Sequence, residues 1–118
     1  MEKVCNVLDV PEGKMKGFTV GSKYILIANI DGNFYAVSAV CPHRGGYLPV
    51  GTLKKNILSC PVHGAEYDVT TGKLIKDVSI EVKLATRSGA HDLSSYKILI
   101  KENSIYIRDL IKVKRLFH

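Results

Sequence analysis

The sequence contains no tryptophan, only three cysteines, and no apolar run long enough to cross a membrane. Its most apolar stretch, residues 24–28, is far short of the roughly 20 residues that a membrane span requires. The N-terminus has no apolar segment before a small-residue cleavage site, so no signal peptide is predicted. An odd number of cysteines does not make a paired disulfide framework, and free thiols suit a reducing compartment. We therefore expect a cytoplasmic, soluble protein.

With 118 residues, of which 46% are hydrophobic and 24% charged, the chain has the size and balance of one globular domain over residues 1–118. Its net charge is +6, but lysine and arginine are scattered along the chain, and no basic stripe is interleaved with aromatic residues. We expect no nucleic-acid binding. A basic surface can instead steer the chain toward an acidic protein partner.

The apolar pattern is that of short β-strands. Two pairs of strands are predicted as hairpins because turn residues separate them: 24–30 and 34–39 around Asp31-Gly32, and 96–101 and 105–108 around 101–104. In 34–39 both alternating faces are apolar, which indicates a strand covered on both sides. Further strands are predicted at 3–7, 15–20, 57–59, 66–69 and 80–84, followed by a surface loop at 86–92. The predicted fold is an all-β antiparallel sandwich or barrel, with a small subdomain at about residues 40–70 built on two loops.

Those two loops carry a regular set of metal-binding side chains. The segments Cys41-Pro42-His43 and Cys60-Pro61-Val62-His63 each combine one thiol and one imidazole, and sixteen residues separate His43 from Cys60. Two thiolates and two imidazoles are the ligands of a Rieske-type 2Fe–2S cluster, in which two cysteines hold one iron and two histidines the other. In this arrangement Cys41 and Cys60 bind the inner iron, and His43 and His63 bind the outer iron near solvent.

A structural zinc ion on the same four residues is the alternative metal site. Zinc sites more often take paired cysteines from one knuckle, so mixed Cys-His pairs on both loops favour the cluster. The remaining cysteine and histidines are given no ligand role. Cys5 lies in an apolar strand and is predicted to be a small buried side chain, His91 lies in a polar loop, and His118 ends the sequence.

The segments 41–46 and 60–72 closely resemble the cluster-binding segments of Rieske-type ferredoxins. The resemblance covers residues 3–76 closely and 93–107 more loosely. It implies a β-sandwich with a cluster-binding subdomain and one 2Fe–2S cluster. The residues expected around the four ligands are Arg44, Gly45, Gly46, Gly64, Ala65 and Tyr67.

Several positions depart from that family. Rieske proteins of respiratory complexes clamp the two loops with a disulfide, but the matching residues here are Gly46 and Val62. They also have a serine and a tyrosine near the cluster sulfurs; here the serine position is Ala65, and Tyr67 is kept. Because hydrogen bonds to sulfur raise the reduction potential, we expect a potential in the lower part of the family range. Tyr47, the long segment 77–92 and the basic tail 110–118 also differ and have no assigned role.

No catalytic motif is present, so the chain is predicted not to be an enzyme by itself. The first functional hypothesis is a one-electron carrier that takes electrons from a flavoprotein reductase and passes them to an oxygenase or a similar terminal enzyme. The second is a Rieske subunit of a larger oxidoreductase, resembling the small subunit of nitrite reductases. The third is a zinc-binding or metal-free binding module.

Overall fold

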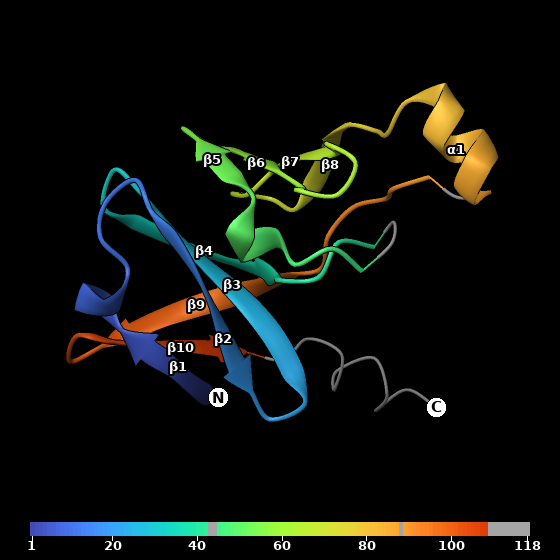
Figure 1. The fold of residues 1–118 in the computed structure, drawn as a ribbon. Helices are drawn as coiled ribbons and strands as arrows, with labels where there is room; N and C mark the ends of the chain where they lie inside the picture. The colour runs from blue at the N-terminus through green and yellow to red at the C-terminus, as the bar shows by residue number, and fades with distance from the viewer. Residues whose placement is uncertain (43–44, 88, 109–118) are drawn as a thin grey trace.

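The computed structural model describes residues 1–42, 45–87 and 89–108. It consists of two antiparallel sheets and one short helix, with the small sheet stacked above the large one (Figure 1). The large sheet has the strand order β1-β10-β9-β4-β3-β2, and its two edge strands, β1 and β2, lie against each other, so that it nearly closes into a barrel. Its strands are β1 (Glu2–Asn6), β2 (Met15–Val20), β3 (Lys23–Ile30), β4 (Asn33–Ser38), β9 (Ser95–Lys101) and β10 (Ser104–Arg108).

The small sheet has the order β5-β6-β7-β8 and follows the large sheet's β4 in the chain. Its strands are short, namely β5 (Thr52–Lys54), β6 (Ile57–Ser59), β7 (Glu66–Asp68) and β8 (Lys73–Lys76). Two 3-10 turns, η1 (Val7–Asp9) and η2 (Leu48–Val50), complete the connections. Strands β5 and β8 were missing from the sequence prediction, because β5 has a single apolar residue, Leu53, and the two apolar residues of β8, Leu74 and Ile75, are adjacent, so neither strand shows an alternation.

Both predicted hairpins are confirmed. The turn between β3 and β4 has positive φ at Asp31 and Gly32, and the turn between β9 and β10 has positive φ at Glu102 and Asn103. Two successive residues of positive φ make the primed turn whose twist matches that of paired strands.

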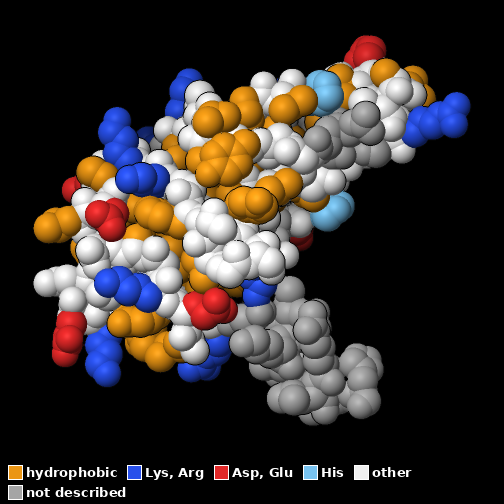
Figure 2. Space-filling view, turned by 60° about the horizontal axis from the view of Figure 1, so that its bottom comes forward, with side chains coloured by type: hydrophobic (Ala, Val, Ile, Leu, Met, Phe, Trp, Pro, Cys, Tyr) orange, Lys and Arg blue, Asp and Glu red, His pale blue; other side chains and the backbone are white. Residues whose placement is uncertain are grey.

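Figure 2 shows hydrophobic side chains exposed on the face in view and lysine and arginine side chains distributed around the body.

The predicted strand at 80–84 is wrong, because Ile80–Thr86 forms the helix α1. The apolar residues Ile80, Val82 and Leu84 alternate as in a strand, but only Val82 packs against a core. The helix begins after Ser79, whose hydroxyl accepts the backbone N–H of Val82 at 3.3 Å. This N-cap is the local signal that the alternation concealed. The fold is therefore mostly β, with one short helix.

Strands β3 and β4 separate two hydrophobic cores, as expected for a strand covered on both sides. On one face, Ile25 and Ile27 join the core between the halves of the large sheet, which includes Cys5, Ile105 and Ile107. On the opposite face, Leu26, Ala28, Val37 and Ala39 join a second core beneath the small sheet. The second core contains Cys41, Cys60 and Tyr67, so two of the predicted ligands are built into the packing between the sheets.

Candidate metal centre

The first predicted ligand loop follows β4 and is closed by its own backbone. Cys41 donates its N–H to the carbonyl of Gly46 at 2.8 Å, and Gly45 donates its N–H to the carbonyl of Cys41 at 2.9 Å. Gly45 has φ of +74°, a conformation that favours glycine. The backbone bridge between Val40 and Tyr47 lies just outside these bonds and fixes the base of the loop.

The second loop, between β6 and β7, is closed in the same way. Cys60 donates its N–H to the carbonyl of Ala65 at 2.8 Å, and Gly64 donates its N–H to the carbonyl of Cys60 at 3.1 Å. Gly64 has φ of +76°. The shared sequence signal is the motif Cys-Pro-x-x-Gly, in which the glycine lies four residues after the cysteine in both loops. Two equivalent loops therefore present their cysteines in equivalent positions.

The two thiols meet in the second core. Cys41 and Cys60 are 2% and 5% exposed, both are free, and the Cys60 thiol lies in hydrogen-bonding contact with Cys41. Burial raises the pKa of the Cys60 thiol, and the neighbouring Cys41 raises it further. The backbone N–H groups of Val62 and His63 act in the opposite direction, because they donate to the Cys60 sulfur and stabilise a thiolate.

Tyr67 is the polar side chain that reaches the first thiol. Its hydroxyl lies 3.2 Å from Cys41 Sγ, and the residue is fully buried in β7, opposite Leu58 of β6 and Leu74 of β8. Burial, followed by the contact with Cys41, raises the pKa of Tyr67 well above its ordinary value. The hydroxyl therefore stays protonated and is available as a donor to a thiolate sulfur.

Gly46 sets how closely the two loops approach. A Cβ atom built on Gly46 would lie 2.8 Å from Cys60 Sγ, 2.7 Å from Val62 Cγ2 and 3.5 Å from Val62 Cβ. Residues 46 and 62 therefore face each other across the loops, and neither is a cysteine. At the base of the second loop, Ala65 is buried and presents no hydroxyl.

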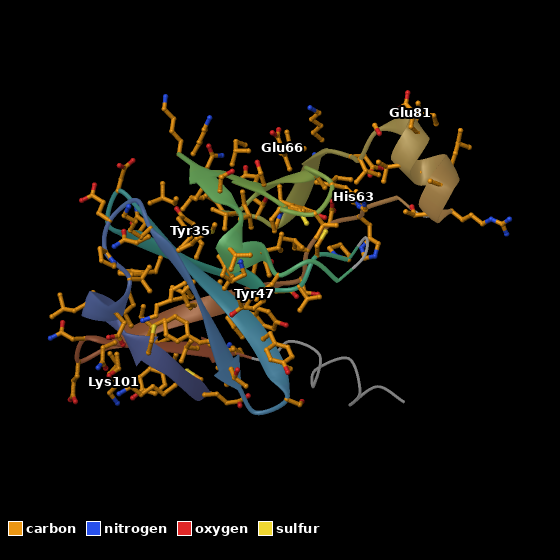
Figure 3. All side chains as sticks on the ribbon, in the orientation of Figure 1. Tyr35, Tyr47, His63, Glu66, Glu81 and Lys101 are labelled. Carbon is orange, nitrogen blue, oxygen red and sulfur yellow. The ribbon has the colours of Figure 1, made fainter. Side chains whose placement is uncertain are left out.

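The structure describes one of the two predicted histidine ligands. His63 is exposed at the outer side of its loop (Figure 3), whereas His43 and its neighbour Arg44 lie outside the described residues. Within the described ranges, no three His, Cys, Asp or Glu side chains are grouped to hold a metal ion.

The remaining cysteine and histidines do not join this centre in the described structure. Cys5 is buried in the other core, and burial raises the pKa of its thiol to about 11. His91 is exposed, with its Nδ1 3.2 Å from the carbonyl of Asp92. The prediction for His118 falls outside the described residues.

Segment 77–92 contributes to the centre in a way that sequence reasoning missed. Val78 and Leu93 are buried in the same core as the two thiols. Asp77 ties the ends of the segment together, because its Oδ1 accepts the N–H groups of Val78 at 2.7 Å and Ala90 at 2.8 Å. Its Oδ2 pairs with Lys83 Nζ at 3.1 Å. The apolar residues at the two ends of a polar stretch were the available signal.

The donor set suits an iron–sulfur cluster. Two adjacent thiols are held in a largely apolar core, with backbone N–H groups directed at one sulfur and a hydroxyl at the other. Thiolates bind iron, and hydrogen bonds to sulfur together with burial tune the potential of such clusters.

Residues 1–87 match the family of the Rieske [2Fe-2S] domain. The chain belongs to the Rieske family. Its cofactor is accordingly a Rieske-type 2Fe–2S cluster, and the mostly β architecture is the Rieske fold. The resemblance to Rieske-type ferredoxins inferred from the sequence is confirmed.

Relatives of this Rieske domain occur both as small ferredoxins and within larger proteins. The ferredoxin component of biphenyl 2,3-dioxygenase from Rhodococcus jostii is 34% identical over 73 residues, which cover 62% of this chain and 68% of that protein. Human apoptosis-inducing factor 3 is 30% identical over 105 residues, which cover 89% of this chain. The match spans only 16% of the human protein.

Solved structures agree with the fold. One chain in a complex of reduced oxygenase and oxidized ferredoxin of carbazole 1,9a-dioxygenase is 26% identical with a TM-score of 0.73, and the match covers 90% of this chain and 99% of that chain. The Sphingomonas yanoikuyae B1 ferredoxin has a TM-score of 0.76 at 20% identity, covering 91% and 96% of the two chains, a likeness of fold. In the described part of this Rieske domain, no helix is long and apolar enough to span a membrane.

Proposed function

We propose that this Rieske domain is a one-electron carrier whose cluster is held by Cys41, His43, Cys60 and His63. The observation that carries the proposal is the pair of equivalent loops that bring two buried thiols together while His63 stays exposed. A bound cluster would supply a one-electron couple. The four ligands would hold it, and the Tyr67 hydroxyl and the backbone N–H groups of the second loop would donate hydrogen bonds to the two cysteine sulfurs. The domain spans residues 1–118, with about 40–70 as its cluster-binding part.

The exposed histidine edge is the proposed route for electrons. The cysteine side of the site is enclosed by the second core, so a partner gains its shortest access from the side of the exposed His63. We expect a flavoprotein reductase as the donor and an oxygenase as the acceptor, in the cytoplasm. The similarity to the ferredoxin component of a biphenyl dioxygenase supports an oxygenase as the acceptor.

A second candidate is a Rieske unit that works inside a larger oxidoreductase. The match to a small part of apoptosis-inducing factor 3 favours it, because there a related domain lies within a much longer chain. Gentle lysis followed by size-exclusion chromatography separates the two. A carrier elutes alone and is reduced by a reductase in solution, whereas a fixed subunit elutes with its larger partner.

The metal is tested on anaerobically purified protein. A Rieske cluster requires about two irons per chain and a signal of low average g after reduction with dithionite. One zinc per chain and no colour would overturn the proposal. In a cluster-loaded His63→Cys variant the potential should fall, because an anionic thiolate replaces a neutral imidazole. The matched control His91→Cys should leave the potential unchanged.

A further inference from the structure

The outer face of β1, β10 and β9 carries four positive side chains and no carboxylate. The strand register places Lys97 opposite Arg108, Leu99 opposite Tyr106, and Lys101 opposite Ser104. Lys3 of β1 is opposite Tyr106 and therefore lies on the same face. Directly opposed residues of antiparallel strands share one face of the sheet, so the like-charged pair Lys97 and Arg108 lies side by side. We call this surface, made by Lys3, Lys97, Leu99, Lys101, Tyr106 and Arg108, the basic face.

Nothing in the described structure neutralises these charges. Among residues 1–42, 45–87 and 89–108, none of the four cations of the basic face is in an ion pair, and the pair between Lys83 and Asp77 lies on the segment beside the small sheet. The nearby carboxylates lie elsewhere: Glu2 is opposite the inward-facing Ile107, and Glu102 is in the turn between β9 and β10. Like charges on directly opposed residues destabilise a sheet. An anionic partner would therefore reduce the repulsion between Lys97 and Arg108, which the described fold does not compensate.

The basic face also has an exposed apolar centre. Leu99 is 43% exposed, and Met1 is 69% exposed. A hollow of about 140 Å³ is lined by Met1, Lys97, Ile98, Leu99 and Arg108. Apolar side chains among lysines and arginines are the composition of surfaces that lie on anionic lipid.

We propose that the basic face binds an anionic membrane surface. Three of its four cations are lysines, which are depleted from protein–protein interfaces but act well as point charges toward a lipid headgroup layer. With a volume of about 140 Å³ the hollow is too small to enclose a typical small-molecule ligand, whereas a lipid surface needs only charge and a few apolar contacts.

The layered fold keeps the cluster accessible in this arrangement. The basic face is separated from Cys41 and Cys60 by the core within the large sheet and by β3 and β4, and the small sheet lies beyond these strands (Figure 1). Attachment through the basic face would therefore leave the loops at 41–46 and 60–65 free for an electron-transfer partner. The proposal extends the role of the chain and does not depend on which partner exchanges electrons with it.

The test is sedimentation of the full, cluster-loaded chain with vesicles. We expect binding to phosphatidylcholine vesicles that contain about one third phosphatidylserine, and its loss between about 0.05 and 0.5 M salt. The face variant is Lys97→Gln/Lys101→Gln/Arg108→Gln. Each charge contributes about fivefold to binding near an anionic surface, so this variant should bind about 100-fold more weakly.

The matched control Lys54→Gln/Lys55→Gln/Lys73→Gln removes the same charge from exposed positions around the small sheet and should stay within a few-fold of the parent chain. An equal loss in both variants would show that only net charge matters and would overturn the basic face. Absence of binding to the anionic vesicles, or equal binding to pure phosphatidylcholine, would overturn the membrane proposal. So would face-dependent binding to polyglutamate without vesicle binding, because it would identify an acidic protein as the partner. The visible spectrum of the cluster confirms that each variant is folded and loaded.

Discussion

The hydroxyl of Tyr67 should raise the reduction potential of the cluster, and its removal tests the geometry of the site directly. The hydroxyl lies 3.2 Å from Cys41 Sγ in a fully buried position. Reduction adds one negative charge to the cluster, so a donor to a ligand sulfur stabilises the reduced state more than the oxidised one. Tyr67→Phe removes the donor while keeping the ring that packs between the sheets.

The size of the effect follows from ordinary hydrogen-bond energies. A hydrogen bond to a charged group contributes about 2 kcal/mol. If about half of it distinguishes the two redox states, the difference is about 1 kcal/mol, which is about 40 mV for a one-electron couple. The Tyr67→Phe potential should therefore lie about 40 mV lower. Ala65→Ser should shift it the other way if the new hydroxyl reaches the second loop's sulfur.

Protein-film voltammetry of the loaded variants measures both shifts. Tyr106→Phe is the matched control, because Tyr106 lies on the outer face of β10. The core within the large sheet and strands β3 and β4 lie between it and the ligands Cys41 and Cys60. A Tyr67→Phe protein with an intact cluster signal and an unchanged potential would refute the assignment of the hydroxyl as a donor to the cluster. A change shared by Tyr106→Phe would show that the effect is not local.

Three further outcomes are expected. Gly46→Ala should lower the iron bound per chain, because the added Cβ would lie 2.8 Å from Cys60 Sγ; full iron loading would contradict the close approach of the loops. The pKa of Asp68 is raised by burial, but the hydrogen bonds from the Thr70 hydroxyl and N–H more than offset this and leave it below its ordinary value. Its contribution is therefore present above the unfolded pKa of about 4 and is lost as the pH falls through the lower folded pKa. Asp68→Asn should cost about 1 kcal/mol at pH 7 in urea unfolding and nothing at low pH, and a constant difference would contradict this role. Removal of iron by a chelator should increase hydrogen exchange in β5–β8 more than in β9 and β10, because the cysteines belong to the core beneath the small sheet; equal increases would show that the two cores unfold together.

The features that were predictable from sequence depend on residues that lie close together in the chain. Asp31-Gly32 predicted a tight turn and therefore the pairing of β3 with β4. The apolar residues on both alternating faces of β4 predicted that this strand is covered on two sides. Cys-Pro followed by glycine four residues later specified two equivalent loops.

The features that were not predictable depend on contacts between distant segments. The approach of Cys41 to Cys60 is set by the packing of the small sheet on β3 and β4, and the spacing of the residues does not contain it. The helix at 80–86 was mistaken for a strand because its seven residues are too few to show a helical period, while its apolar residues alternate as in a strand. Cross-strand register was also needed to show that Lys97 and Arg108 are neighbours, since ten residues separate them in sequence.

The two cores give the chain two surfaces that can change independently. The core beneath the small sheet contains both thiols and Tyr67, so any substitution there acts on the cluster and on packing at once. The core within the large sheet contains none of the predicted ligands, and the basic face lies on its far side. Because β3 and β4 are covered on both faces and belong to both cores, they transmit stability between the halves while they hold the surfaces apart. Substitutions of the basic face should therefore weaken vesicle binding without changing the reduction potential of the cluster.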